Sequence, residues 1–323
     1  MRLLVTGGNG FIGSHFVRNY LKKNPTDEIV NLDVLSYAGR KENLLDVEKD
    51  PALAPRYHFM HGDIRRRETV EKAMQGCEAV VHFAAESHVD NSLNDASIFI
   101  DTNVTGTYRL LEAARKHTIK RFLHVSTDEV YGHILEGSFS EKDLLHPRNP
   151  YSASKAGAEM MVQAFHETYG LPAVITRSSN NFGPNQFPEK VIPLFITNLL
   201  RGKKVPLYGE GKNIRDWIFV EDNCAGIELV LQKGKVGEVY NIAGEQELTN
   251  LELTHAILKE MGHGEEMIQR VEDRKGHDLR YSLDASKAKA LGYSPSQSFS
   301  ARLHQTIAWY RNNEWWWKPL VKN

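Results

Sequence analysis

A hydroxyl and two adjacent carboxylates occur together at Thr127, Asp128 and Glu129. They follow the apolar run 121–125, which is typical of a buried strand, so we expect them in the loop where that strand ends. In a loop, unlike in a strand, both carboxylates can turn into one cleft. Their charges repel, which favours one general acid and one general base. Taken alone, Thr-Asp-Glu is more typical of an acidic loop facing water, so the chemical interpretation depends on its neighbours.

A second pair of residues, Tyr151 and Lys155, has the spacing of a catalytic base and its activator. Pro150 predicts a helix start, and side chains four residues apart lie on one helix face. A phenol has a pKa near 10, so a base at neutral pH requires a shift of about three pKa units, or roughly 4 kcal/mol. A nearby ammonium and the positive charge of an oxidised nicotinamide can provide that shift. Tyr-x-x-x-Lys alone is common on helix surfaces, and a nucleotide-binding fold beside it favours the catalytic interpretation.

Glycines near the start of the sequence predict a dinucleotide-binding turn. Residues 3–6 have the pattern of a buried strand, and apolar residues recur with helical spacing over 11–21. Between them, Gly7, Gly10 and Gly13 allow backbone N–H groups to approach a diphosphate at the helix N-terminus. The next strand, 28–32, ends at Asp33, whose carboxylate can accept hydrogen bonds from ribose hydroxyls and repel a 2′-phosphate. These features predict NAD rather than NADP as the cofactor.

The same alternation of strands and helices continues along the chain. Strands are predicted at 57–61, 79–83, 121–125 and 173–177, with a long helix at about 96–117. This order predicts an α/β fold with a Rossmann-type doubly wound parallel sheet and ligands at the carboxyl ends of its strands. At those ends, Asp63 and Ile64 form a plausible edge for adenine. Ala84 and Ala85 are small enough for a cofactor to pass close over the sheet.

Beyond residue 181 the alternation stops, which predicts a smaller, mixed C-terminal domain. We expect an NAD-binding domain of 1–180 with a returning segment at about 216–243, including a strand at 217–220. The sugar-nucleotide-binding domain is then 181–215 and 244–323, with a helix at 188–201 and a strand at 205–208. The three tryptophans at 315–317 are predicted to dock on this second domain rather than to bind a ligand.

Composition and charge argue against several classes of partner. The 323 residues carry a net charge of −1, so we expect neither a nucleic-acid nor a membrane partner, and the basic run 65–67 is interpreted as a local surface feature. No stretch approaches 18 continuous apolar residues, and the first residues enter a strand directly, without a signal peptide. Two cysteines without metal-ligand spacing predict no disulfide framework and no metal site. We therefore expect a cytoplasmic protein.

The motifs together resemble the extended short-chain dehydrogenase/reductase superfamily, and within it the nucleotide-sugar 4,6-dehydratases. The resemblance covers essentially the whole chain. The Asp-Glu pair is specific to the dehydratases, because 4-epimerases of this fold carry small polar residues there. The motifs are Thr-Gly-Gly-Asn-Gly-Phe-Ile-Gly (6–13), Ala-Ala-Glu-Ser-His-Val-Asp (84–90), Ser-Thr-Asp-Glu-Val-Tyr-Gly (126–132), Pro-Tyr-Ser-Ala-Ser-Lys (150–155), Ser-Asn-Asn-Phe-Gly-Pro (179–184), Arg-Asp-Trp (215–217) and Asp-Arg-x-Gly-His-Asp (273–278).

The resemblance implies a role for each of the five catalytic candidates. Tyr151, tuned by Lys155 and hydrogen-bonded near Thr127, takes the C4 hydroxyl proton of a sugar while the C4 hydride goes to NAD. Glu129 then removes the C5 proton and Asp128 protonates the leaving C6 hydroxyl. Return of the hydride to C6 gives a 4-keto-6-deoxy sugar nucleotide and regenerates NAD without its leaving.

The binding residues follow from the fingerprint and the resemblance together. Four of the substrate candidates are cationic or carry an imidazole, which suits a nucleotide diphosphate, and Tyr208 is implied to pack against the base. The cofactor candidates are Gly7, Gly10, Phe11, Ile12, Gly13, Asp33, Ser36, Asp63, Ile64, Phe83, Ala84, Ala85, Ser87, Thr102, Tyr151, Lys155 and Asn181. The substrate candidates are Ser87, Thr127, Asn180, Lys190, Pro206, Tyr208, Arg215, Asn250, Arg274 and His277.

Alternatives remain open at this stage. The expected substrate is a dTDP-sugar, dTDP-glucose, with UDP-glucose or UDP-N-acetylglucosamine as the nearest alternative. A nucleotide-sugar 4-epimerase is disfavoured by the acid pair, and a non-catalytic NAD-binding sensor by the tyrosine and lysine. Asn91 and Lys275 depart from the family pattern near the substrate or cofactor edges, which leaves the nucleotide preference open. The resemblance also implies a homodimer formed by helices at about 96–117 and 152–169.

Overall fold

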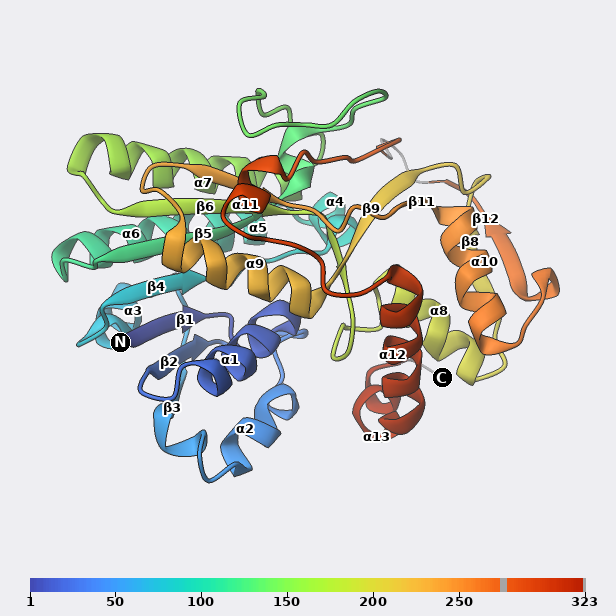
Figure 1. Ribbon diagram of the computed structural model, residues 1–323, viewed down its shortest axis with the longest axis horizontal. Helices are drawn as coiled ribbons and strands as arrows, with labels where there is room; N and C mark the ends of the chain where they lie inside the picture. The colour runs from blue at the N-terminus through green and yellow to red at the C-terminus, as the bar shows by residue number, and fades with distance from the viewer. Residues whose placement is uncertain (274–277, 322–323) are drawn as a thin grey trace.

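The computed structural model describes residues 1–273 and 278–321, and within them a large parallel sheet dominates the fold (Figure 1). Its seven strands follow the order β10-β6-β5-β4-β1-β2-β3, and each pairs with its neighbours in parallel. The predicted doubly wound parallel sheet is therefore confirmed. The strands are β1 (Arg2–Thr6), β2 (Glu28–Asp33), β3 (Tyr57–His61), β4 (Ala79–His82), β5 (Arg121–Thr127), β6 (Ala173–Ser178) and β10 (Val239–Ile242).

Alternation of side chains along the strands gives the sheet two apolar faces. Leu3 and Val5 of β1 pack into the core beneath α1 (Phe11–Lys23) and α9 (Val220–Lys233). Leu4 packs on the opposite face, with α3 (Arg67–Met74), α6 (Thr107–Lys116) and α7 (Pro150–Tyr169). Both layers are buried, as a parallel sheet requires.

Local signals define the ends of the functionally important helix α7. Asn149 caps its start by accepting a hydrogen bond from the Ser152 backbone N–H (2.8 Å), and Pro150 occupies the first helical position. Gly170 ends the helix in the left-handed conformation, with φ +67°. The result is a 20-residue helix whose first turn carries the tyrosine and whose second carries the lysine.

A predicted helix and a predicted strand of the first domain differ from the structure. The helix expected at about 96–117 is divided into α5 (Ser97–Phe99), a π-helical segment (Ile100–Gly106) and α6. The strand expected to end at residue 125 continues to Thr127, because Thr127 still pairs with Ser178 of β6. The acids therefore lie on a short 3₁₀ helix, Asp128–Tyr131, rather than in an irregular loop, and the Thr127 hydroxyl caps it by accepting from the Glu129 N–H (3.3 Å).

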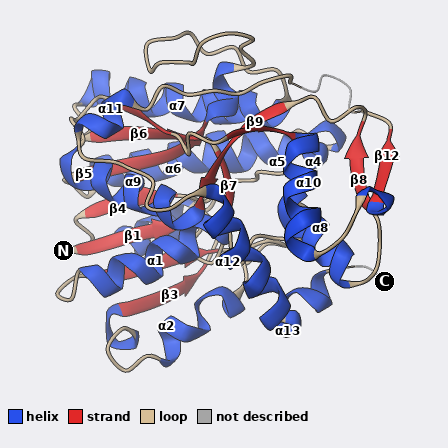
Figure 2. Ribbon diagram, turned by 45° about the vertical axis from the view of Figure 1, so that its right-hand side comes forward, coloured by secondary structure: helices blue, strands red, loops and turns tan. Residues whose placement is uncertain are grey.

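The later part of the chain forms two small sheets at the carboxyl edge of the large one (Figure 2). The strand expected at 217–220, within the segment predicted to return to the first domain, is β9 (Ile214–Phe219), which pairs with β7 and β11 in a small sheet. The helix and strand after it do return, as α9 and β10. The remaining elements are β7 (Asn180–Phe182), β8 (Val205–Tyr208), β11 (Glu247–Thr249), β12 (Ile268–Val271), α2 (Leu45–Lys49), α4 (Val89–Asn94), α8 (Val191–Leu200), α10 (Asn250–Met261), α11 (Ser286–Ala290), α12 (Phe299–Asn312) and α13 (Glu314–Trp317).

The C-terminal tryptophans contact both helix α12 and the segment between β2 and α2. Trp316 and Trp317 are buried, while Trp315 is 58% exposed. The Trp317 indole donates to the Tyr310 carbonyl (2.7 Å) in α12, but the Trp316 indole donates to Asn43 Oδ1 (2.8 Å), in the segment between β2 and α2. The cluster thus also docks beside the first strands of the large sheet. Across residues 1–273 and 278–321, no helix combines the length and apolarity that crossing a membrane requires.

Candidate active site

A cavity of about 480 Å³ follows the carboxyl ends of the large sheet, where a dinucleotide is expected. All but one of the predicted cofactor residues line it, from the glycine turn across the sheet to the start of α7. They are Gly7, Gly10, Phe11, Ile12, Gly13, Asp33, Ser36, Asp63, Ile64, Phe83, Ala84, Ala85, Ser87, Thr102, Tyr151 and Lys155. The remaining candidate, Asn181, lines a second cavity instead, where its side chain bonds to the Ser179 carbonyl (3.0 Å) and its Oδ1 accepts from Asn223 (2.8 Å).

The glycine turn has no side chains that would keep a diphosphate away from its backbone N–H groups. Gly7 has φ +74°, and a Cβ there would lie 2.6 Å from the backbone nitrogen of Ala84. Asp33 is buried, and its carboxylate accepts from the backbone N–H groups of Asn9 (2.9 Å) and Leu35 (2.8 Å). Burial raises the pKa of Asp33, while these two hydrogen bonds oppose the shift. The cradle and the acid at the end of β2 fit a dinucleotide with a free 2′-hydroxyl.

Several residues of this cavity carried no signal in the sequence. Arg65, taken as part of a surface run, lines the cavity and pairs with Asp63 (2.6 Å). Phe187 and Glu189 also line it, and both contact Tyr37 in the segment after β2, by an edge-to-face ring contact (5.4 Å) and a hydrogen bond (3.1 Å).

The tyrosine and the lysine lie one helical turn apart against the end of β5. The Lys155 ammonium donates to the Val125 carbonyl (2.7 Å), and burial lowers the pKa of Lys155 to about 8, an effect opposed by the charge of Glu159. Burial, followed by the charge of Glu129, raises the pKa of Tyr151, and a hydrogen bond with Thr127 opposes this. The phenol is therefore protonated in the chain by itself, and added positive charge is needed to make it a base.

The two acids differ in their surroundings. Asp128 is 3% exposed, and burial, then the charge of Glu129, raises its pKa well above the usual range. Its Oδ1 accepts from the Thr127 hydroxyl (3.1 Å), whereas Oδ2 has no hydrogen-bond partner among the residues that the structure describes. Burial also raises the pKa of Glu129, but Lys190 and Arg215 oppose the shift. Asp128 is thus the acid that holds a proton and Glu129 the one that more readily gives up its own.

A second cavity, of about 340 Å³, adjoins the first. Glu129 lines it and Ser126 lines the first, whereas Thr127 and Asp128, between them in the sequence, are in the lining of neither cavity. Ser87, predicted for both ligands, lines the first, and its carbonyl accepts from Lys190 Nζ (3.0 Å). The predicted substrate residues Arg274 and His277, and the departure Lys275, lie outside the described residues. The predicted substrate residues that line the second cavity are Asn180, Lys190, Pro206, Tyr208, Arg215 and Asn250.

The cationic side of the second cavity is built around Asp278. Arg215 donates to the Asp278 carbonyl (3.0 Å), and its guanidinium lies 4.2 Å from the centroid of the Tyr281 ring. The Asp278 carboxylate accepts from Arg148 (2.8 Å) and from the Tyr281 hydroxyl (2.6 Å). The resemblance included Asp278 in a motif, but no pattern marked Arg148 or Tyr281, because both reach the site only through the tertiary fold. Asn180 adds a buried Oδ1 without a partner in the described part of the chain.

The parallel sheet, the glycine turn and the Tyr–Lys pair define a dinucleotide-binding α/β protein, and Glu129 of the acid pair lies in the wall of its second cavity. Residues 4–306 match the family model described as GDP-mannose 4,6 dehydratase, so the chain belongs to this family of nucleotide-sugar dehydratases.

The relatives narrow the comparison within the family. The chain is 49% identical over 325 residues to a dTDP-glucose 4,6-dehydratase of Streptomyces niveus, covering 99% of this chain and 96% of the relative. It is 52% identical over 314 residues to a low-salt glycan biosynthesis protein of Haloferax volcanii, covering 97% and 100%. A crystal structure of dTDP-glucose 4,6-dehydratase from Streptomyces venezuelae, with NAD and dTDP bound, is similar with a TM-score of 0.96 and 53% identity, covering 99% and 100%.

Proposed function

We propose that this chain converts dTDP-glucose to dTDP-4-keto-6-deoxyglucose by eliminating water across C5 and C6, with NAD in the first cavity and the sugar nucleotide in the second. The observation that carries the proposal is the position of the acid pair. Asp128 and Glu129 lie beside Thr127 and within electrostatic reach of Tyr151, and Glu129 lines the second cavity. An enzyme that only oxidises and reduces C4 has no use for two further acids there.

Tyr151 serves as the base at the C4 hydroxyl. Its hydrogen bond with Thr127 orients the phenol, and the Lys155 ammonium, anchored on the Val125 carbonyl, adds positive charge beneath the first cavity. NAD, when bound, supplies the remaining positive charge, accepts a hydride from C4 and returns it to C6. The phenol keeps the proton in the meantime.

Elimination is assigned to the acid pair. A ketone at C4 acidifies the C5 hydrogen, and Glu129 takes that proton as general base. Asp128, whose raised pKa keeps it protonated, gives its proton to the C6 hydroxyl, which leaves as water. Glu129 then returns its proton to C5 when hydride reaches C6, which completes the 4-keto-6-deoxy product. The different surroundings of the two carboxyls, with Lys190 and Arg215 acting on Glu129, favour this division of roles over the reverse.

The test is a direct assay with two substrates. Purified protein incubated in parallel with dTDP-glucose and UDP-glucose is expected to form a 4-keto product from dTDP-glucose at the higher kcat/KM, and to release NAD rather than NADP on denaturation. A C4 epimer as the product would contradict the dehydratase assignment. Faster turnover of UDP-glucose would support the dehydratase reaction but would show that UDP-glucose, not dTDP-glucose, is the preferred substrate.

The arrangement of the whole protein is proposed on the same basis. The NAD-binding domain is 1–180 with the returning segment at about 216–243, in which α9 and β10, but not β9, rejoin the large sheet. The remaining residues bind the sugar nucleotide, and the protein acts in the cytoplasm. Ile100 and Met160, on the π-helical segment and α7, are 48% and 47% exposed, which supports a homodimer through these helices. A monomer mass that does not change with concentration in light scattering would exclude the dimer.

A further inference from the structure

Tyr131 closes the 3₁₀ helix that carries the acids, yet the proposed chemistry does not use it. Its side chain is 1% exposed, and its ring stacks on Phe139 with centroids 4.8 Å apart. The hydroxyl accepts from Arg177 Nη1 (2.6 Å) and donates to Asn241 Oδ1 (2.9 Å). The phenol is thus fixed from both sides of its oxygen, which is more than filling a core position requires.

Arg177 continues this network into helix α7. It forms a buried ion pair with Glu159, in which Nε lies 3.0 Å and Nη2 2.6 Å from Oε2. Arg177 is 2% exposed and Glu159 is fully buried. Burying such a pair costs desolvation energy that the attraction often fails to exceed, so its presence is a weak argument for stability and a better one for fixed geometry.

The elements that this network joins are those that carry the two halves of the chemistry. Glu159 lies one turn after Lys155 on α7, the helix that also carries Tyr151. Tyr131 belongs to the same 3₁₀ helix as Asp128 and Glu129. The path Glu159–Arg177–Tyr131 therefore ties the acid-bearing segment to the helix of the tyrosine and lysine through side chains alone.

We propose that Tyr131 is a positioning residue for elimination: its hydroxyl, held by Arg177 and Asn241, fixes the 128–131 segment so that the acids keep their places relative to Tyr151. The inference rests on the proposed function, since it concerns the step assigned to Asp128 and Glu129. Glu159 has a second effect on the same machinery, because its charge opposes the lowering of the pKa of Lys155.

Tyr131→Phe isolates the hydroxyl, because it keeps the ring and its stack on Phe139. Oxidation at C4 depends on residues of β5 and α7 and is expected to continue. Elimination is expected to slow, so that kcat falls about 10-fold or more while KM stays within about 2-fold. Reduced nicotinamide should therefore accumulate during turnover and be visible by its absorbance.

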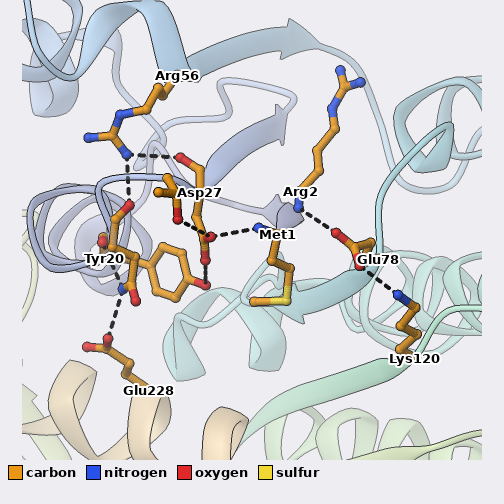
Figure 3. A network of polar contacts seen from close by, with 10 residues as sticks. Met1, Arg2, Tyr20, Asp27, Arg56, Glu78, Lys120 and Glu228 are labelled. Atoms are coloured by element: carbon orange, nitrogen blue, oxygen red, sulfur yellow. Dashed lines mark hydrogen bonds and ion pairs between the residues drawn. The ribbon is translucent and has the colours of Figure 1, made fainter.

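Tyr20→Phe is the matched control. Tyr20 is also buried, and its hydroxyl donates to Asp27 (2.7 Å) in a polar network at the amino ends of the strands, the edge of the sheet opposite the cavities (Figure 3). Both variants lose a buried phenol hydroxyl, which makes one hydrogen bond at Tyr20 and two at Tyr131. Only Tyr131→Phe is expected to accumulate reduced nicotinamide, and only it should show faster amide hydrogen exchange at 128–131.

The outcomes separate this inference from the proposed function. If the wild type makes no 4-keto product, the proposed function fails. If the wild type turns over and Tyr131→Phe matches it, or loses oxidation and elimination equally, or resembles Tyr20→Phe, the positioning role is wrong. Should Tyr131→Phe not fold, Phe139→Leu loosens the other contact of the ring and leaves its hydroxyl in place. That variant is then expected to show the same accumulation at a smaller amplitude, and wild-type behaviour would overturn the inference.

Discussion

The two cavities are built in different ways. Part of the wall of the first is backbone and small side chains at the ends of neighbouring strands, as at Gly7, Ala84 and Ala85. The second is assembled from side chains of distant segments, among them Glu129, Asn180 and Arg215. A cavity made by backbone can be destroyed by one added methyl group, whereas a cavity made by side chains loses one contact at a time. Substitutions in the two cavities should therefore fail in different ways.

The largest effect is expected for Gly7→Ala. The added Cβ would collide with the backbone of Ala84 at a positive φ, so the variant should lose roughly 1–3 kcal/mol of stability together with its bound NAD and all measurable turnover. Gly170→Ala is the control, because Gly170 also has positive φ (+67°) but nothing lies within 4 Å of its Cβ. It should lose stability and keep its NAD. Measured NAD content after denaturation distinguishes the two, and a Gly7→Ala protein that retains cofactor would contradict the backbone description.

Asp128→Asn tests the proton donor of the acid pair. An amide of the same size cannot donate a proton to a leaving hydroxyl, so turnover should fall about 10²–10⁴-fold while C4 oxidation continues. Absorbance of reduced nicotinamide after addition of dTDP-glucose is the measurement. Tyr151→Phe should fail earlier, with little reduced cofactor. Wild-type turnover by Asp128→Asn would assign proton donation to another group, and failure to reduce the cofactor would make Asp128 a sugar-positioning residue.

A smaller and more selective effect is expected for Arg215→Lys in the second cavity. Lysine keeps the charge but loses the planar group that lies over Tyr281 and bonds to the Asp278 carbonyl. KM for the sugar nucleotide should rise about 10-fold, since loss of a charged hydrogen bond costs roughly 1.5–3 kcal/mol. NAD content should stay at the wild-type level. Loss of NAD from this variant would show that the cavities do not fail independently.

The smallest effect concerns the charge buried beneath the first cavity. The pKa of Lys155 is lowered to about 8 by burial, so between pH 8 and its unfolded value of about 10.5 the unfolded chain binds more protons at this site and stability rises with pH. Lys155→Met removes this cost and should melt at a higher temperature than the wild type at pH 7, with little activity.

The pH dependence of this difference is the decisive measurement. The difference in melting temperature between Lys155→Met and the wild type should narrow as pH rises from 8 toward 10. Ionisation of the buried tyrosines affects both proteins equally and therefore does not change this difference. Lys120→Met, at a lysine whose side chain is 75% exposed, serves as the control and should show no such gap. A constant gap for Lys155→Met would argue against a buried ammonium.

The contrast between the cavities also explains what could be predicted from the sequence. The strand, glycine turn, helix and terminal Asp33 are encoded by local periodicity and by residues whose backbone needs are specific, so this part of the first cavity was predictable from the sequence. Arg65 was missed because its role depends on Asp63 facing the same cavity. In the second cavity, Arg148 and Tyr281 are brought together because both bond to the Asp278 carboxylate. No local sequence pattern predicts contacts between such distant segments.

Errors in the predicted elements have the same origin. The strand before Asp128 was expected to end two residues early, because its extension depends on pairing between Thr127 and Ser178. The π-helical turn at Ile100–Gly106 was likewise invisible, since helical periodicity in the sequence does not report one extra residue in a turn. Pairing and register are properties of the assembled sheet rather than of either segment.

The bond between Trp316 and Asn43 has a consequence for how the protein is made. Asn43 also donates to the Asn9 carbonyl (2.8 Å) inside the glycine turn, so the tryptophan supports, through one amide, a loop that is synthesised far earlier. The two bonded residues are 273 positions apart, which a ribosome adding about 5–20 residues per second covers in tens of seconds. Until Trp316 is synthesised, Asn43 and the glycine turn that it contacts lack this hydrogen bond. A ribosome-bound chain arrested before α13 is therefore expected to hold NAD less tightly than the released protein does.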